Sequence, residues 1–153
     1  MTTDYPTGET VARAFFDAWN AGDADAIASL FTPDADFVNV VGIWWTSARQ
    51  IRKAHDYGFR RIFQNAQLTI MELKVRELTT DIHIVHTVST LDGQTSVNEV
   101  SAGRRIAVIS MVTIREPGGF RIVSCQNTDR VEGADTHLNS AAGLRPVSYA
   151  TRE

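Results

Sequence analysis

The most regular pattern of hydrophobic and polar positions lies between residues 47 and 63. Small and apolar residues recur there at helical spacing and, together with one histidine, form one stripe: Ile51, Ala54, His55, Gly58, Phe59, Ile62 and Phe63. Ser47 followed by Gln50 is typical of a capping box at a helix start. The pattern predicts a long amphipathic helix after Ser47, with one titratable side chain, His55, on its apolar stripe.

Two shorter helices and a strand are predicted before this helix. Val11, Phe15, Ala18 and Trp19 share one helical face. Gly22 permits the left-handed conformation with which a helix often ends, and Asp23 can cap the next helix. The expected elements are helices over about 8–21 and 24–31, a stop at Thr32-Pro33-Asp34, a strand over 36–40 and a loop around Trp44 and Trp45.

After Phe63 the hydrophobic period changes from helical spacing to alternation, which predicts strands. The expected strands cover 68–78, 82–91, 105–115 and 120–131, with a loop over 92–103. We therefore predict one α+β domain over 1–131, beginning with a polar lead-in, in which three helices pack on a curved, mostly antiparallel sheet and enclose a cone. The polar segment 132–153 is expected to be an irregular tail.

Composition and charge narrow the class of protein. The chain has 153 residues and a net charge of −3, without the basic excess that nucleic-acid binding requires. No apolar run is long enough to cross a membrane and no signal peptide is evident, so a cytoplasmic location is expected. Cys125 is the single cysteine and has no neighbour in sequence that would activate it. No phosphate-binding or dinucleotide motif is present, and we expect no cofactor.

Two segments resemble known families. NAGDADAIASLFTPDADFVNVVG resembles the helix–loop–helix–strand signature of the nuclear transport factor 2-like superfamily, which includes ketosteroid isomerases, SnoaL-type polyketide cyclases and scytalone dehydratases. FVNVVGIWW followed by IRKAHDYGFRRIF resembles more narrowly the SgcJ/EcaC family, whose members occur near enediyne and other natural-product gene clusters. The resemblance covers about residues 10–131. It implies a cone-shaped fold, a homodimer through the outer face of the sheet and a polyketide-like hydrophobic ligand.

The chemistry of the isomerases does not carry over to this sequence. The position that resembles their general-base aspartate is Asn39, and their oxyanion-hole tyrosine falls on Phe15. Their second oxyanion donor falls near Val112, so the apparatus that stabilises a dienol is missing. A supporting tyrosine of their pocket falls on His55. The same resemblance turns His86, Asn127 and Asp129 toward the cavity.

The candidate catalytic residues are His55, Asp129 and His86, and each has a structural alternative. His55 can transfer protons, or it can be a neutral core histidine bonded to a backbone carbonyl. His86 alternates with Ile84 and Val88, which places it on their face of the sheet, whereas His83 is expected in solvent. Asp129 can orient one of these histidines or act as a base with a raised pKa; alternatively it pairs with Arg130 or Arg104 at the surface.

The expected ligand-binding residues are Asn39, Trp19, Trp44, Phe59, Phe63 and Asn127. Asn39 can fix a carbonyl or hydroxyl, or it can cap the adjoining loop. Adjacent Trp44 and Trp45 cannot both point inward in an extended loop. Arg104 and Arg105 are expected on a solvated face. Two histidines and Asp129 do not have metal-ligand spacing, so we expect no metal site.

Three functional hypotheses follow. The first is an auxiliary enzyme of natural-product metabolism, in which His55 transfers protons with Asp129 or His86 and Asn39 orients a carbonyl. The second is a non-catalytic protein that binds or carries such a ligand. The third is a protein–protein adaptor whose cavity is filled.

Overall fold

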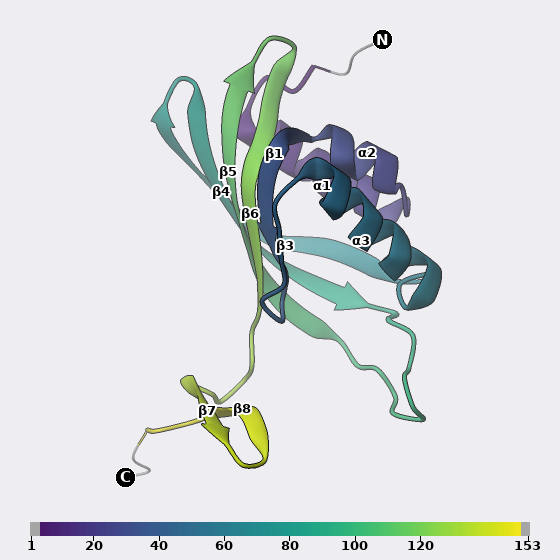
Figure 1. The fold of residues 1–153 in the computed structure, drawn as a ribbon. Coiled ribbons are helices and arrows are strands. Elements are labelled where there is room, and N and C mark those ends of the chain that lie inside the picture. Colours follow the sequence, from purple (N-terminus) through teal and green to yellow (C-terminus); the bar gives the residue numbers. More distant parts are fainter. Residues whose placement is uncertain (1–3, 151–153) are drawn as a thin grey trace.

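The computed structural model describes residues 4–150 (Figure 1). The outermost residues of the predicted lead-in and tail, 1–3 and 151–153, lie outside the described residues. The elements in chain order are α1 (Gly8–Asn20), α2 (Ala24–Ser29), β1 (Phe31–Val38), β2 (Trp44–Trp45), α3 (Ala48–Arg61), β3 (Gln67–Thr79), β4 (Ile82–Asp92), β5 (Arg105–Glu116), β6 (Gly119–Asp129), β7 (Thr136–Ser140) and β8 (Gly143–Val147).

Six strands form one sheet in the order β2-β1-β6-β5-β4-β3. Strands β3 to β6 are the predicted antiparallel meander, and β1 joins β6 in parallel. The three helices cover the concave face of this sheet, which bends around them (Figure 1). The predicted fold class is confirmed: an α+β layer of N-terminal helices on a curved, mostly antiparallel sheet.

Side-chain caps fix where the three helices begin. Thr7 caps α1, and its side chain accepts a hydrogen bond from the Thr10 amide at 3.1 Å. Asp23 caps α2 as predicted, with the Ala26 amide 2.8 Å away. Ser47 caps α3, but the Gln50 side chain accepts from the Thr46 amide rather than from the cap residue. Each cap satisfies an amide that has no partner inside the helix.

The first strand begins earlier than the sequence predicts. Phe31, predicted as the end of a helix, is the first residue of β1 and pairs with Ile122. The register shifts between Phe31 and Asp36, so Pro33 lies in an irregular part of the strand, where a missing amide costs no regular ladder bond. Helix α2 therefore ends at Ser29, before Pro33, and the proline does not prevent the strand.

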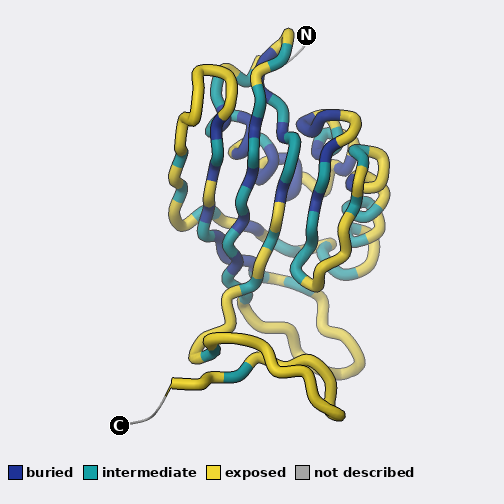
Figure 2. Tube along the Cα trace, turned by 60° about the vertical axis from the view of Figure 1, so that its left-hand side comes forward, coloured by how far each residue is buried: buried dark blue, intermediate teal, exposed yellow. Residues whose placement is uncertain are grey.

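The prediction of an irregular C-terminal tail was wrong, because the segment forms a hairpin of β7 and β8. The polar composition of the segment concealed two short strands that meet at a tight turn, where Gly143 has φ +94°. Almost all side chains of the hairpin are exposed, and it stands clear of the body of the domain (Figures 1 and 2). The hairpin therefore adds nothing to the hydrophobic core.

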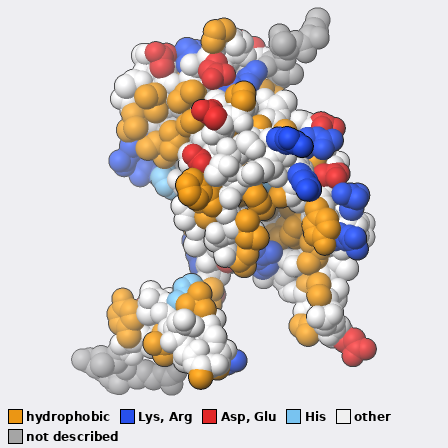
Figure 3. Space-filling view, viewed as in Figure 1, with side chains coloured by type: hydrophobic (Ala, Val, Ile, Leu, Met, Phe, Trp, Pro, Cys, Tyr) orange, Lys and Arg blue, Asp and Glu red, His pale blue; other side chains and the backbone are white. Residues whose placement is uncertain are grey.

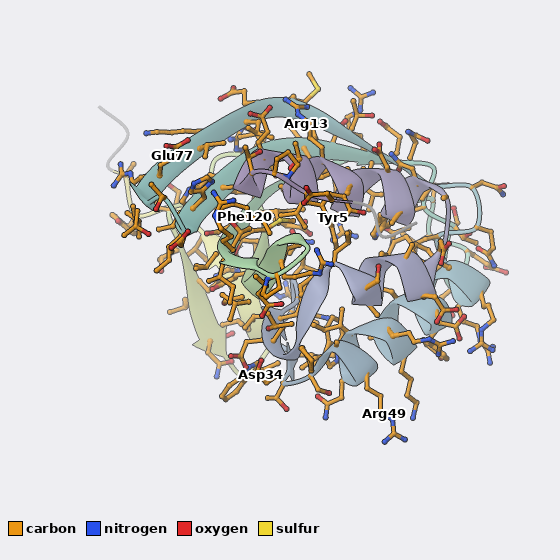
Figure 4. All side chains as sticks on the ribbon, turned by 90° about the horizontal axis from the view of Figure 1, so that it is seen from above. Tyr5, Arg13, Asp34, Arg49, Glu77 and Phe120 are labelled. Atoms are coloured by element: carbon orange, nitrogen blue, oxygen red, sulfur yellow. The ribbon has the colours of Figure 1, made fainter. Side chains whose placement is uncertain are left out.

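The core lies between the helices and the concave face of the sheet, and buried residues alternate with more exposed ones along much of β4 to β6 (Figure 2). Phe15, Ile51 and Phe120 are among its largest buried side chains. Seen from above, Arg49 points away from the molecule on the solvent side of α3 (Figure 4). Within the described residues, no helix is long and apolar enough to cross a membrane.

Candidate functional site

A cavity of about 160 Å³ lies between α1, α3 and the concave face of the sheet. Its wall is mainly aromatic and aliphatic, and includes Phe15, Trp19, Phe37, Trp45, Phe59, Phe63, Leu68, Leu91 and Ile109. Its polar lining consists of Asn39, His55, Arg105, Asn127 and Asp129. A mostly apolar recess with a few polar groups is typical of small-molecule sites.

His55 lies on the cavity wall, as its place on the apolar stripe of α3 predicts. Its ring is surrounded by Phe15, Phe37, Trp45 and Phe59, with ring centroids 5.4 to 6.2 Å away. Its Nδ1 lies 2.8 Å from the carbonyl oxygen of Ile51, one turn earlier. The backbone bond expected of a structural histidine is therefore present, and the same imidazole also borders a void.

The surroundings of His55 determine its protonation state. Burial lowers the pKa of the imidazole, and the bond to the Ile51 carbonyl opposes this shift only in part. A carbonyl oxygen can only accept, so Nδ1 carries the proton and the neutral ring keeps Nε2 as an acceptor. His55 is therefore a neutral hydrogen-bond acceptor near pH 7.

Asp129 lines the cavity but orients neither histidine. It accepts two hydrogen bonds from Arg105, from Nε at 2.9 Å and from Nη2 at 3.1 Å, while Nη1 of Arg105 donates to Gln94 at 2.9 Å. Both side chains of the pair are about 30% exposed, at 29% and 31%. The expected surface partners, Arg104 and Arg130, were wrong, as was the solvated face expected for Arg105. The mouth of the cavity carries a charge pair with no net charge.

Arg105 is the polar residue of the cavity lining that sequence reasoning missed. Arg105 alternates with Ala107 and Ile109 along β5, and all three line the cavity. This period of two was a usable signal, but β5 is apolar on both faces, so the pattern did not show which face is concave. The pairing of Ala107 with Asp129 brings the carboxylate beside the guanidinium.

The two asparagines play different parts. The side-chain oxygen of Asn39 accepts from the amides of Val41 and Ile43 at 3.1 and 2.8 Å, which closes the loop after β1. The loop-capping alternative is therefore correct for this oxygen, and only the amide nitrogen remains to contact a ligand. The side-chain oxygen of Asn127 is buried and has no hydrogen-bond partner among the described residues.

Trp45, not Trp44, faces the cavity. In the short antiparallel pair of β1 and β2, Trp45 lies opposite Phe37 and Trp44 opposite Val38. Directly opposed residues share a face of the sheet, so Trp45 follows the buried Phe37 inward. Trp44 is 63% exposed, and its indole nitrogen donates to Asp36 at 2.7 Å. Contrary to expectation, Trp44 does not line the cavity, whereas Trp19, Phe59 and Phe63 do.

The two histidines of β4 lie opposite to the prediction. His86 is exposed on the convex face of the sheet, and His83 is buried, with 4% of its surface exposed. The Nδ1 of His83 accepts from the Gly8 amide at the start of α1, at 3.1 Å, and its ring stacks on Phe120. Both alternating sets of β4 contain aliphatic residues, so periodicity could not assign the faces. His86 cannot act with His55 across the sheet.

Phe15, Val112 and Cys125 lie in three different surroundings. Phe15 lines the cavity, whereas Val112 is half-buried on the convex face. Cys125 is buried in the core, and burial raises the pKa of its thiol. Among the residues 4–150 that the structure describes, no three histidine, cysteine or acidic side chains come together as metal ligands.

Solved structures share this fold. A protein of cystatin-like fold from Caulobacter vibrioides has a TM-score of 0.74 at 22% identity, over 81% of this chain and 87% of that chain. A domain of unknown function with a cystatin-like fold from Nostoc punctiforme has a TM-score of 0.68 at 25% identity, over 80% and 75%. A ketosteroid isomerase-like protein from Erwinia carotovora atroseptica has a TM-score of 0.67 at 15% identity, over 80% and 93%.

No curated protein sequence matches the chain. The family model described as a SnoaL-like domain matches residues 12–125, which include most of α1, all of α2 and α3, and most of the six-stranded sheet. This segment supplies most of the cavity wall, while Asn127 and Asp129 follow directly after it. The chain therefore belongs to the SnoaL-like domain family and has the nuclear transport factor 2-like fold.

Proposed function

We propose that the protein binds a small, oxygenated and largely apolar molecule in the cavity between α1, α3 and the sheet. The observation that carries this proposal is the position of the His55 imidazole, which borders the void within a wall of aromatic rings. The arrangement provides apolar area for binding and one strong acceptor for orientation.

The volume of the cavity limits what it can hold. Apolar cavities of about 150 Å³ admit benzene, so a void of about 160 Å³ accommodates roughly one ring. A polyketide- or enediyne-type intermediate, which the SgcJ/EcaC resemblance suggests, would place one ring inside and the remainder at the mouth beside Asn39 and Arg105. The adaptor hypothesis required a filled interior, and no observation favours it.

Binding of toluene, followed through the methyl NMR signals of Leu68, Leu91 and Ile109, tests the proposal. Ala54 lies on the cavity wall, so A54F should fill the void and weaken binding at least tenfold. K53F adds the same ring on the exposed side of α3 and should leave affinity unchanged. Equal affinity of A54F and the wild type would contradict binding in this cavity.

Acid–base catalysis is the second candidate function, and the free Nε2 acceptor of His55 favours it. Because Asp129 is paired with Arg105 and His86 lies on the other face, His55 would act alone. A general base of this kind accelerates proton transfer by about 10² to 10⁴. Deuterium exchange at the α-carbon of cyclohexanone, compared between the wild type and H55F, measures it. Equal exchange rates, with the ketone bound, would leave binding as the function.

We further propose that a second copy of the chain covers the convex face of the sheet. Half-buried β-branched residues run across its central strands, namely Ile84, Val88, Val108, Val112 and Ile114. Leu78 and Ile82 extend this apolar area at the β3–β4 turn, where Figure 3 shows hydrophobic side chains gathered beside basic ones. A face of this kind suits a self-complementary, twofold contact.

A further inference from the structure

We infer that the ligand of the cavity is a neutral ring that bears a hydroxyl group and donates it to the protein. This inference rests on the proposed function and specifies the chemical class of its ligand. It follows from three features of the lining: an acceptor on α3, an acceptor on β6 and a neutralised charge pair at the mouth.

The first acceptor is Nε2 of His55. The bond between Nδ1 and the Ile51 carbonyl fixes the proton on the other ring nitrogen. The four rings around His55 are Phe15, Phe37, Trp45 and Phe59. No hydrogen bond to Nε2 occurs within the described part of the chain. A ligand hydroxyl would supply the missing donor.

The second acceptor is the side-chain oxygen of Asn127. It is buried, it belongs to a residue that lines the same cavity, and no described residue donates to it. A buried acceptor without a donor costs about 1–3 kcal/mol, and a ligand hydroxyl would recover this cost once rotation of the amide brings the oxygen to the void. Asn127 pairs with Ile109 on β5, another residue of the cavity wall.

The charge pair at the mouth makes an ionised ligand unsuitable. The guanidinium of Arg105 is held by both oxygens of Asp129 and by Gln94. A carboxylate ligand would approach the charge of Asp129, and a cationic ligand would approach that of Arg105. Neither ligand would meet an unpaired counter-charge in the lining. With room for about one ring, the cavity fits a phenol-sized neutral donor.

The inference is tested with three probes of similar size: p-cresol, 4-methylanisole and benzoate. We expect p-cresol to bind at least tenfold more tightly than 4-methylanisole, which lacks the donor; tenfold is about 1.4 kcal/mol. Dissociation constants come from the methyl signals of Leu68, Leu91 and Ile109. N127A should reduce the preference for p-cresol to below about threefold, within the range expected for one lost hydrogen bond. Q126A changes an exposed neighbour on β6 and should leave the preference for p-cresol over 4-methylanisole unchanged.

The outcomes separate this inference from the proposed function. Equal affinities for p-cresol and 4-methylanisole, with shifts at the cavity methyls, would overturn the donor requirement and leave ring binding intact. Tighter binding of benzoate would overturn the preference for a neutral ligand. If neither neutral probe shifts the cavity methyls at millimolar concentration, the inference and the proposed function both fail. The comparison of probes in the wild type decides the matter even if N127A does not fold.

Discussion

Replacing His55 by phenylalanine should remove a defined part of the pH dependence of stability. Burial lowers the pKa of this imidazole in the folded protein. The unfolded chain, with an ordinary histidine pKa of about 6.5, therefore takes up the proton first as the pH falls. Its contribution to stability is present above about pH 6.5 and is lost as the pH falls toward the folded-state pKa. Phenylalanine keeps an apolar ring among Phe15, Phe37, Trp45 and Phe59 but cannot titrate.

The size of the effect follows from proton linkage. While the folded ring stays neutral, each pH unit below about 6.5 lowers the free energy of unfolding by up to about 1.4 kcal/mol. Between pH 7.5 and 5.5 the loss attributable to His55 is thus at most about 1.4 kcal/mol. The charged residues that line the cavity with His55 are Arg105 and Asp129, which are paired with each other. On α3 itself, Arg52, Lys53 and Asp56 flank it in sequence.

Urea unfolding followed by circular dichroism at pH 7.5, 6.5 and 5.5 measures the effect, at one fixed protein concentration. The free energy of unfolding of the wild type should fall over this range, and that of H55F should fall by up to about 1.4 kcal/mol less. H137Q removes an exposed histidine from the C-terminal hairpin, outside the domain and the proposed interface, and should behave as the wild type. If H55F keeps the full slope of the wild type, the imidazole is not shielded as the structure indicates, and its role as a neutral acceptor fails.

Three further predictions concern the mouth, the convex face and the tail. D129N should lower the free energy of unfolding by about 1–2 kcal/mol in urea, because Arg105 loses a partly buried bidentate partner; D92N, at a more exposed pair, should change it little. V112E should convert a dimer to a monomer in sedimentation, whereas an unchanged mass would contradict the proposed interface. Removal of 132–153 should leave the thermal midpoint unchanged, because β7 and β8 share no core with the domain; a clear decrease would contradict this.

The helices were predictable from sequence because their signals are local. Capping residues and the apolar stripe lie within one or two turns of each other, so Ser47 and His55 were placed correctly. The alternation of strands predicted the meander for the same reason. Such patterns establish which elements form but leave their faces open when both sides of a strand are apolar. His83 and His86 were exchanged for this reason.

The site depended on contacts that no local pattern contains. Arg105 and Asp129 lie on different strands, and only the register of β5 against β6 brings them together. The pairing of Trp45 with Phe37 likewise decided which tryptophan enters the cavity. Composition gave a wrong prediction for the C-terminal segment, because its polar residues indicated an irregular chain whereas the structure has the β7–β8 hairpin there. Most of the polar residues that line the cavity were thus named from the sequence, whereas their hydrogen-bond partners were not.

The burial of Cys125 has a practical consequence. The chain has a single cysteine, and its thiol is enclosed in the core with a raised pKa, so alkylating reagents should scarcely modify it in the native protein. A cysteine introduced in place of Gln94, next to the cavity mouth, would be the one readily labelled position. An environment-sensitive dye attached there would report ligand entry by fluorescence, without prior removal of the native sulfhydryl.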